Sequence, residues 1–278
     1  MRRKILSISL LAVVIFSLSA CSEMSRIEKS NDFNKKLAYA NKLYDKGKYS
    51  QAQQLYDGVK DIFKGTKYFE DLFYRMAYTY YYTKDYETAA FYFKNFTELF
   101  PNSPRATEMD YMQAYCYYNL SPREELDQTN TRKAIAAMQT FINTHPDAAD
   151  KVVEANKIID LCRGKLEAKE YKAATLYFNL GYFKAAGVYF TNLMRDYPGS
   201  DNSDQYKFMS IKSYYRYAEN SIRMRQIDRY EQVISAYLDF VDHFPKSKYL
   251  KDAEKYYTLS QNTLKTLQNE QSKEKSDQ

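Results

Sequence analysis

The chain has 278 residues, of which 41 are basic and 35 acidic, and it contains 30 tyrosines, 7 glycines and 6 prolines. Three of the basic residues, Arg2, Arg3 and Lys4, lie at the start of the chain, so the rest of the chain has a net charge close to neutral. This balance does not favour a nucleic-acid-binding protein, which would have a concentrated basic face. The scarcity of glycine and proline indicates helices joined by few turns.

The first 20 residues have the layout of a cleaved secretory signal. Their apolar stretch, Ile5 to Leu18, is shorter than the roughly 20 residues needed to span a bilayer, which disfavours a membrane-spanning anchor. The residues Leu18, Ser19, Ala20 and Cys21 resemble a bacterial lipobox. We therefore expect residues 1–20 to be removed and Cys21 to carry a covalent N-acyl and S-diacylglycerol lipid.

The residue after the cysteine bears on where such a lipoprotein resides. Ser22 stands there instead of aspartate, which by resemblance to proteobacterial lipoproteins favours the outer membrane. No acidic run of the kind that resembles a surface-export tag follows Cys21, so we expect the lipid to lie in the leaflet that faces the periplasm. Residues 21–33 are expected to tether the lipid to the folded part.

An apolar pattern recurs along the chain and ends each time at a proline. Phe100, His145, Tyr197 and Phe244 each precede a proline, and small and large apolar residues recur at fixed positions before it. Small residues let two helices approach closely, while aromatic residues fill the gap to the next hairpin. Three segments match the tetratricopeptide (TPR) repeat in register: Ala40, Leu43, Ala52, Tyr56 and Val59; Ala77, Tyr80, Ala89, Phe93 and Pro101; Ala174, Tyr177, Ala186, Phe190 and Pro198.

The predicted fold is all-α, an α-solenoid of about five TPR hairpins within residues 34–267. The repeats cover about 33–66, 70–103, 107–147, 167–200 and 207–246, and a capping helix covers 249–267. The polar residues 268–278 are expected to be disordered. Two inter-helix turns are expected to be lengthened, at 121–130 and 223–228, and one long helix should bridge the third and fourth repeats.

The sequence contains no pattern typical of an enzyme. His145 and His243 both stand at a helix end near a repeat-ending proline, and no nucleophile motif, phosphate loop or metal-ligand spacing is present. Cys116 and Cys162 lie in apolar helical patterns, which favours two buried thiols, although a disulfide is chemically permitted in the periplasm. We expect no catalytic residue, no metal and no cofactor beyond the lipid.

Five hairpins behind a lipobox, with a long helix before the fourth, resemble the BamD family, the TPR lipoproteins of the outer-membrane β-barrel assembly (Bam) complex. The resemblance is closest from Leu166 to Tyr171, at Ala174, Tyr177, Phe178 and Gly181, and from Met194 to Pro198. It implies a non-enzymatic scaffold that faces the periplasm, binds the BamA insertase and other Bam subunits, and contacts unfolded outer-membrane proteins. Within this resemblance the C-terminal half binds BamA, which makes Arg195, Asp196 and Tyr197 the candidate partner-binding residues.

Arg195 is the residue in this segment that we favour, because a guanidinium can pair bidentately with a carboxylate of the partner. The alternative is an exposed arginine that merely complements the dipole at its helix end.

The first helix of each TPR hairpin is expected to line the concave face. The positions that would face this groove in the first two repeats are rich in tyrosine, which offers contact area and a hydroxyl to an extended peptide. The candidate residues are Asn41, Tyr44, Asp71, Tyr74, Arg75, Tyr78, Tyr81 and Tyr82. Alternatively these tyrosines pack adjacent hairpins, and Asn41 with Arg75 only partly matches a TPR carboxylate clamp.

Two other functions fit a TPR lipoprotein. One is an adaptor in cell-envelope or cell-wall organisation, and the other is a glycan-binding outer-membrane lipoprotein. The glycan-binding alternative is less favoured, because such proteins usually add a large loop-rich domain for which this chain has no room.

Overall fold

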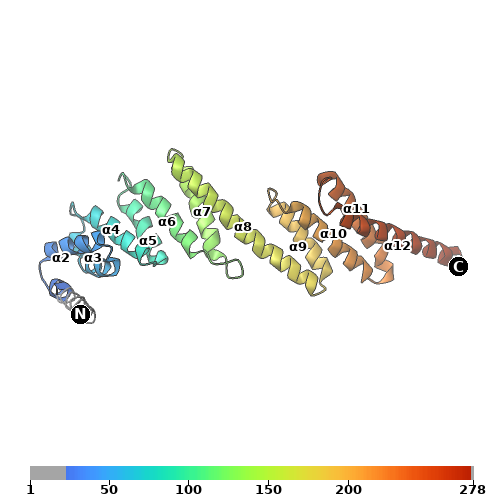
Figure 1. Cartoon of the computed structure of the whole chain (residues 1–278), viewed down its shortest axis with the longest axis horizontal. Helices are drawn as coiled ribbons and strands as arrows, with labels where there is room; N and C mark the ends of the chain where they lie inside the picture. The colour runs from blue at the N-terminus through green and yellow to red at the C-terminus, as the bar shows by residue number, and fades with distance from the viewer. Residues whose placement is uncertain (1–22, 277–278) are drawn as a thin grey trace, which may run out of the picture. The chain divides into compact units, whose positions relative to one another are not determined.

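The computed structural model describes residues 23–276 and shows helices, with no strand in that part of the chain (Figure 1). The all-α prediction is confirmed. The chain divides into two compact units, and their boundary between residues 162 and 163 falls within one long helix, α8 (Ala149–Asn179). The predicted signal, Cys21 and the last two residues lie outside the described residues.

The first unit is a row of helical hairpins. Its pairs are α2 (Phe33–Asp45) with α3 (Tyr49–Phe63), α4 (Phe69–Tyr82) with α5 (Tyr86–Leu99), and α6 (Ala106–Leu120) with α7 (Thr129–Thr144). Consecutive hairpins are joined by packing of α3 on α4 and of α5 on α6. The first half of α8 closes the row, because Ile158 and Cys162 share a core with Phe141 of α7.

The second unit repeats this plan. The second half of α8 pairs with α9 (Phe183–Asp196), since Ala174 lies in one core with Ala186 and Phe190. Next come α10 (Ser203–Glu219) and α11 (Arg223–His243), and α12 (Leu250–Ser276) packs on both. Between residues 23 and 276 no helix is both long enough and apolar enough to cross a membrane.

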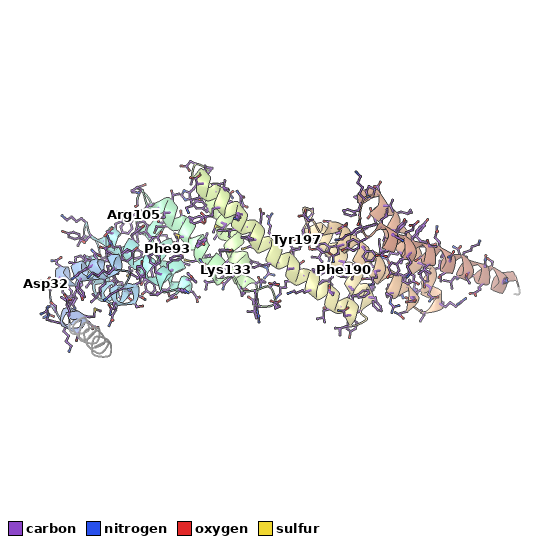
Figure 2. All side chains as sticks on the ribbon, viewed as in Figure 1. Asp32, Phe93, Arg105, Lys133, Phe190 and Tyr197 are labelled. Atoms are coloured by element: carbon purple, nitrogen blue, oxygen red, sulfur yellow. The ribbon has the colours of Figure 1, made fainter. Side chains whose placement is uncertain are left out.

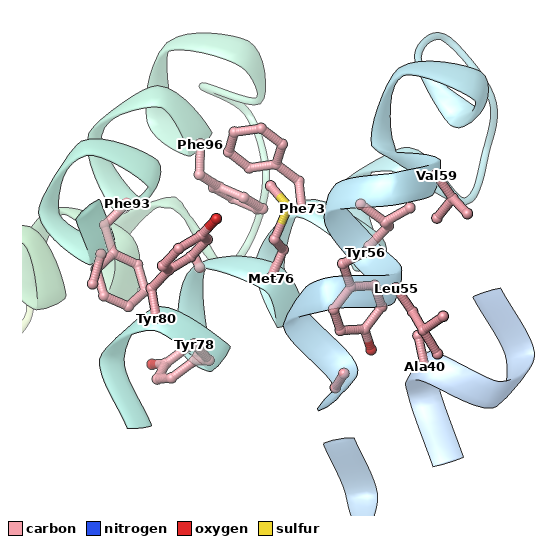
Figure 3. Packing of buried hydrophobic residues seen from close by; sticks show 14 of the residues in the cluster. Ala40, Leu55, Tyr56, Val59, Phe73, Met76, Tyr78, Tyr80, Phe93 and Phe96 are labelled. Carbon is pink, nitrogen blue, oxygen red and sulfur yellow. The ribbon is translucent and has the colours of Figure 1, made fainter. Parts of the chain in front are cut away.

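The cores show why the repeat pattern needs small residues. Ala40, Ala52, Ala77 and Ala89 are all fully buried at the points where two helices of a hairpin touch. Large side chains such as Phe93, which meets the rings of Tyr78 and Tyr81, fill the space around these contacts, as Figure 3 shows for the first unit. Burial of each such side chain contributes about 1.5–3 kcal/mol, so the aligned alanines and aromatics together specify the stack.

Every repeat except the first ends with the same backbone geometry. Phe100, His145, Tyr197 and Phe244 are the C-caps of their helices, with φ between −128° and −130° and ψ between 53° and 63°. The proline that follows disfavours the α conformation at the preceding residue, so the helix stops there. The prolines therefore end every second helix from α5 to α11.

The turn inside three hairpins uses a left-handed residue. Gly47, Lys84 and Gly181 have φ of 70°, 64° and 81° and stand at equivalent places. The amide of the residue that follows then donates back to the helix, as in Lys48 N–H to Leu43 C=O at 2.9 Å and Asp85 N–H to Tyr80 C=O at 3.0 Å. Lys84 adopts this conformation although it carries a Cβ, which glycine does not.

The structure differs from the sequence-based expectations at three places. The expected long turn at 223–228 is wrong, because α11 already begins at Arg223. Residues 268–276, expected to be disordered, continue α12 since no glycine or proline stops it and Arg223 pairs with Glu270. The expected tether is partly folded, because residues 23–28 are helical and Met24 is buried in the core of the first unit.

The two remaining cysteines are both fully buried, Cys116 in α6 and Cys162 in α8. Burial raises the pKa of the Cys116 thiol to about 12, which keeps it protonated and unreactive at neutral pH.

Candidate functional site

The first helices of the first unit carry a connected network of charged and aromatic side chains. Arg75 on α4 donates to Asp45 at the end of α2 at 2.7 Å and to Asp71, one turn earlier, at 2.9 Å. The other oxygen of Asp71 accepts from Arg105 at 3.1 Å, and Arg105 stands at the start of α6 (Figure 2). One carboxylate thus joins two guanidinium groups from neighbouring repeats.

Both guanidinium groups also lie over tyrosine rings. Arg75 is 5.1 Å from the ring centre of Tyr44, and Arg105 is 4.2 Å from that of Tyr74. A cation above an aromatic face gains about 0.5–1 kcal/mol at exposed sites. The candidates Tyr44, Tyr74, Asp71 and Arg75 are therefore brought together, with one guanidinium over each of the two tyrosine rings.

Glu108 on α6 anchors the middle of this surface. The hydroxyl of Tyr78 donates to it, and the hydroxyl of Tyr74 lies 3.4 Å from the same carboxylate. Burial, and then the hydrogen bond and charge of Glu108, raise the pKa of Tyr78. Tyr78 is only 7% exposed, so it supports the surface from below and offers little area to a ligand.

The open part of the surface is a cluster of three tyrosines where α2 and α4 end. Tyr82 is 44% exposed and stacks on Tyr49 with ring centres 4.3 Å apart. Tyr44 meets the edge of Tyr49 at 5.5 Å. We call Tyr44, Tyr49, Tyr74 and Tyr82 the aromatic trough.

The other two groove candidates are mainly structural. Asn41 accepts a hydrogen bond of 2.7 Å from the hydroxyl of buried Tyr56. Tyr81 packs against Tyr86, and burial raises its pKa to about 12.

Sequence reasoning missed Arg105, Glu108 and Tyr49. Glu108 could have been found from the repeat. It stands 37 positions after the groove candidate Asp71, and the groove candidates Tyr44 and Tyr81 are separated by the same 37 positions, so Glu108 occupies the equivalent place in the next repeat. Arg105 and Tyr49 carry no such signal, since they belong to a turn and a second helix.

The second unit holds the other candidate residues. Arg195 near the end of α9 has a side chain 70% exposed, and its guanidinium pairs with its neighbour Asp196 at 2.8 Å. Tyr197 is half-buried and donates to Glu170 at 3.1 Å; burial, then Glu170, raises its pKa (Figure 2). Arg195 and Asp196 are therefore available at the surface, whereas Tyr197 joins α9 to α8.

An exposed apolar patch lies at the other end of α9 from Arg195, around the turn between α8 and α9. Leu180 and Tyr182 are 60% and 62% exposed, and Val188 and Tyr189 are also exposed. A hollow of about 550 Å³ is lined by Tyr182, Val188 and Tyr189 of this patch together with Phe183 and Tyr217. Contiguous apolar surface of this kind marks interaction sites. Val188 and Arg195 are seven residues apart on α9 and so share one helix face.

Within residues 23–276, no three His, Cys, Asp or Glu side chains are placed to hold a metal ion. His145 is used structurally, because its ring contacts Asp110 at 2.8 Å and Phe141.

Comparison with known proteins decides the family. The model of the outer membrane lipoprotein family YfiO matches residues 31–199. The chain belongs to this family. It is 22% identical over 221 residues to the outer membrane protein assembly factor BamD of Caulobacter vibrioides, covering 80% of this chain and 68% of that protein. With the BamD of Pasteurella multocida it shares 24% identity over 52% of this chain and 60% of that protein, so it spans less than two thirds of this relative.

The chain can also be aligned with a solved structure along most of its length. The TPR2AB-domain:pHSP90-complex of yeast Sti1 aligns over 82% of this chain and 98% of that one, at 14% identity and a TM-score of 0.39. The YfiO match covers both the aromatic trough and the patch at the turn between α8 and α9.

Proposed function

We propose that this chain is a non-enzymatic scaffold of the machinery that assembles β-barrel proteins into the outer membrane. Membership of an outer membrane lipoprotein family and the similarity to two BamD assembly factors support this role. The observation that carries it is the presence of two separate exposed surfaces suited to binding other proteins, the aromatic trough and the apolar patch at the turn between α8 and α9.

The aromatic trough binds segments of unfolded outer-membrane proteins. Such segments alternate apolar and polar residues and carry aromatic side chains, which stack on tyrosine at low entropic cost. Arg75 and Arg105 are each engaged with carboxylates, so they hold the tyrosines in place instead of presenting free charge. A peptide then gains affinity from ring stacking and from tyrosine hydroxyls.

The patch on the second unit binds the periplasmic part of a BamA-like insertase. Its exposed side chains Tyr182, Val188 and Tyr189 supply apolar area, and Arg195, seven residues after Val188 on the same face of α9, supplies a charge. Loss of the internal pair with Asp196 costs little, because both groups are solvated at the surface. A partner carboxylate can therefore replace Asp196 on the guanidinium.

The lipid on Cys21 holds the scaffold at the periplasmic face of the outer membrane. This part of the proposal depends on the lipobox and on the family. Mass spectrometry of the protein extracted from membranes tests it directly, because an acylated N-terminal cysteine is expected and an intact leader with a free thiol would contradict it.

Co-purification after mild detergent extraction tests the proposed role. Recovery of a barrel insertase supports assembly, and Val188→Asp should abolish that recovery while Val153→Asp, at a 70% exposed position in the first unit, should not. Cell-wall synthases recovered in place of the insertase would favour an adaptor, and retained glycan would favour glycan binding.

A further inference from the structure

The net charge of the chain beyond the predicted signal is concentrated in one short segment. Residues 23–48 contain 7 basic and 4 acidic side chains, whereas residues 49–278 contain 31 of each. The whole excess of positive charge therefore lies within the segment that follows the lipidation site. The rest of the chain folds with equal numbers of basic and acidic side chains, so folding does not require this local excess of positive charge. Such an excess is suited to binding a negatively charged partner.

Three of the seven cations of this segment form one stripe along α2. Lys35, Tyr39, Lys42 and Lys46 recur at the spacing that places side chains on a single helix face. The lysines are exposed beyond the face that buries Leu37, Ala40 and Leu43, whereas Tyr39 is half-buried against the edge of that core. The ammonium of Lys42 lies 5.5 Å from the ring centre of Tyr39. We call these four residues the basic stripe.

In the described part of the chain, the acidic residues of this segment form no ion pair with the lysines of the basic stripe, although one of them lies against its tyrosine. Asp45 pairs with Arg75, Glu28 accepts from Gln54 at 2.7 Å, and Asp32 caps α2 at the position marked in Figure 2. Glu23 lies against Tyr39, where burial first and then this carboxylate raise the pKa of the tyrosine. Among residues 23–276, none forms an ion pair with Lys35, Lys42 or Lys46.

The stripe is also tied closely to the lipidation site. Residues 23–28 are helical, and Met24 is buried in the core shared with Leu37 and Ala40. Only Ser22 separates this packed segment from Cys21, and an extended residue spans at most about 3.6 Å. A lipid on Cys21 would therefore hold the bilayer surface within about one Debye length, about 8–10 Å, of Glu23 and its neighbour Tyr39.

We propose that the basic stripe binds the anionic phospholipid headgroups of the membrane that holds the anchor, and so fixes the orientation of the first unit on that membrane. The geometry of this proposal rests on the proposed lipidation of Cys21. The lysines supply charge and Tyr39 supplies an interfacial aromatic ring. The face of α2 that buries Leu37, Ala40 and Leu43 remains in the hairpin core, so membrane contact requires no unfolding.

Vesicle flotation tests the stripe separately from the anchor. The chain from residue 21 onward with Cys21→Ser carries no lipid, and it should bind vesicles containing about one third phosphatidylglycerol but not pure phosphatidylcholine vesicles. The triple variant Lys35→Gln, Lys42→Gln, Lys46→Gln should lower the partition coefficient on the order of 100-fold. About 1 M salt should abolish binding.

A matched variant removes the same charge elsewhere. Lys246→Gln, Lys248→Gln, Lys251→Gln changes three exposed lysines of the second unit and should leave vesicle binding within about threefold of the parent chain. Circular dichroism should show both variants folded, because all six positions are exposed. Equal weakening by the two variants, absence of binding by the parent chain, or equal binding to a soluble polyanion such as heparin would overturn the proposal.

Discussion

Ser103 donates a hydrogen bond of 2.7 Å to Glu70, which joins the end of the second repeat to its beginning. The same pairing recurs as Ser247 with Asp204 at 2.6 Å and as Ser200 with Glu167. In the third repeat Ala148 and Thr107 occupy the two positions, and His145 contacts Asp110 instead. Every repeat from the second to the fifth is therefore closed by one polar contact across its ends.

Removal of one closing contact should weaken the stack measurably. Ser103→Ala leaves Glu70 without this donor and also removes the acceptor of the Arg105 amide at 3.1 Å. We expect a loss of about 1 kcal/mol in the free energy of unfolding. Urea denaturation measures it, with Ser50→Ala at an exposed position of α3 as the control. Equal effects of the two substitutions would contradict a role for the contact.

Replacing Lys84, which has a left-handed backbone conformation, by glycine should stabilise the protein. Lys84→Gly relieves the Cβ at φ 64° and should raise the melting temperature, with a gain of about 0.5–1 kcal/mol. At the equivalent place Gly47→Ala should lower stability by about 1 kcal/mol, since Gly47 has φ 70°. Calorimetry of both variants checks the pair, and a stabilising Gly47→Ala would be inconsistent with this turn.

Two glycines within helices should respond in opposite directions to alanine. A Cβ on Gly187 would lie 2.6 Å from the ring of Tyr214, so Gly187→Ala should cost about 1–3 kcal/mol. A Cβ on Gly58 meets nothing within 4 Å, so Gly58→Ala should stabilise by about 0.5–1 kcal/mol through higher helix propensity. The denaturant midpoint should fall for Gly187→Ala and rise for Gly58→Ala. A midpoint that does not fall for Gly187→Ala would contradict the close approach of α9 and α10.

Stability should fall in alkaline solution because buried tyrosines resist ionisation. Burial, and then its hydrogen bond to Glu167, raise the pKa of Tyr206 to about 12, above the value of about 10 expected in the unfolded chain. A raised pKa means that the folded state holds the proton more tightly, so this stabilisation is complete below pH 10 and is lost as the pH rises toward 12. Thermal melts between pH 9 and about 12 measure the decline, which Tyr206→Phe should make shallower. A decline of the same slope in the variant would exclude Tyr206 as a contributor.

The sequence predicts the hairpins of the fold better than the side-chain contacts of the candidate site. Ala77, Ala89, Phe93 and the prolines predict the hairpins, because each apolar residue must face a core at a fixed helical spacing. The partners of long polar side chains depend on neighbouring repeats, so the bridge from Arg75 through Asp71 to Arg105 could not be read from spacing. Tyr78 shows the same limit, since its position predicts a groove residue while packing buries it.

The tail was mispredicted for a related reason. Composition alone assigned disorder to the residues after Leu267, yet an anchored helix can continue through polar residues that have good helix propensity. The contact of Glu270 with Arg223 is a tertiary interaction that composition does not show.

Photo-crosslinking in living cells tests the central claim most directly, with a crosslinking residue placed at Tyr82 in one variant and at Val188 in another. Both positions are exposed, so the replacement should leave the fold intact. We predict that the Tyr82 position traps unfolded outer-membrane proteins and that the Val188 position traps a BamA-like insertase. Crosslinks only to cell-wall synthases, or none from either position while the protein is folded and abundant, would contradict the account.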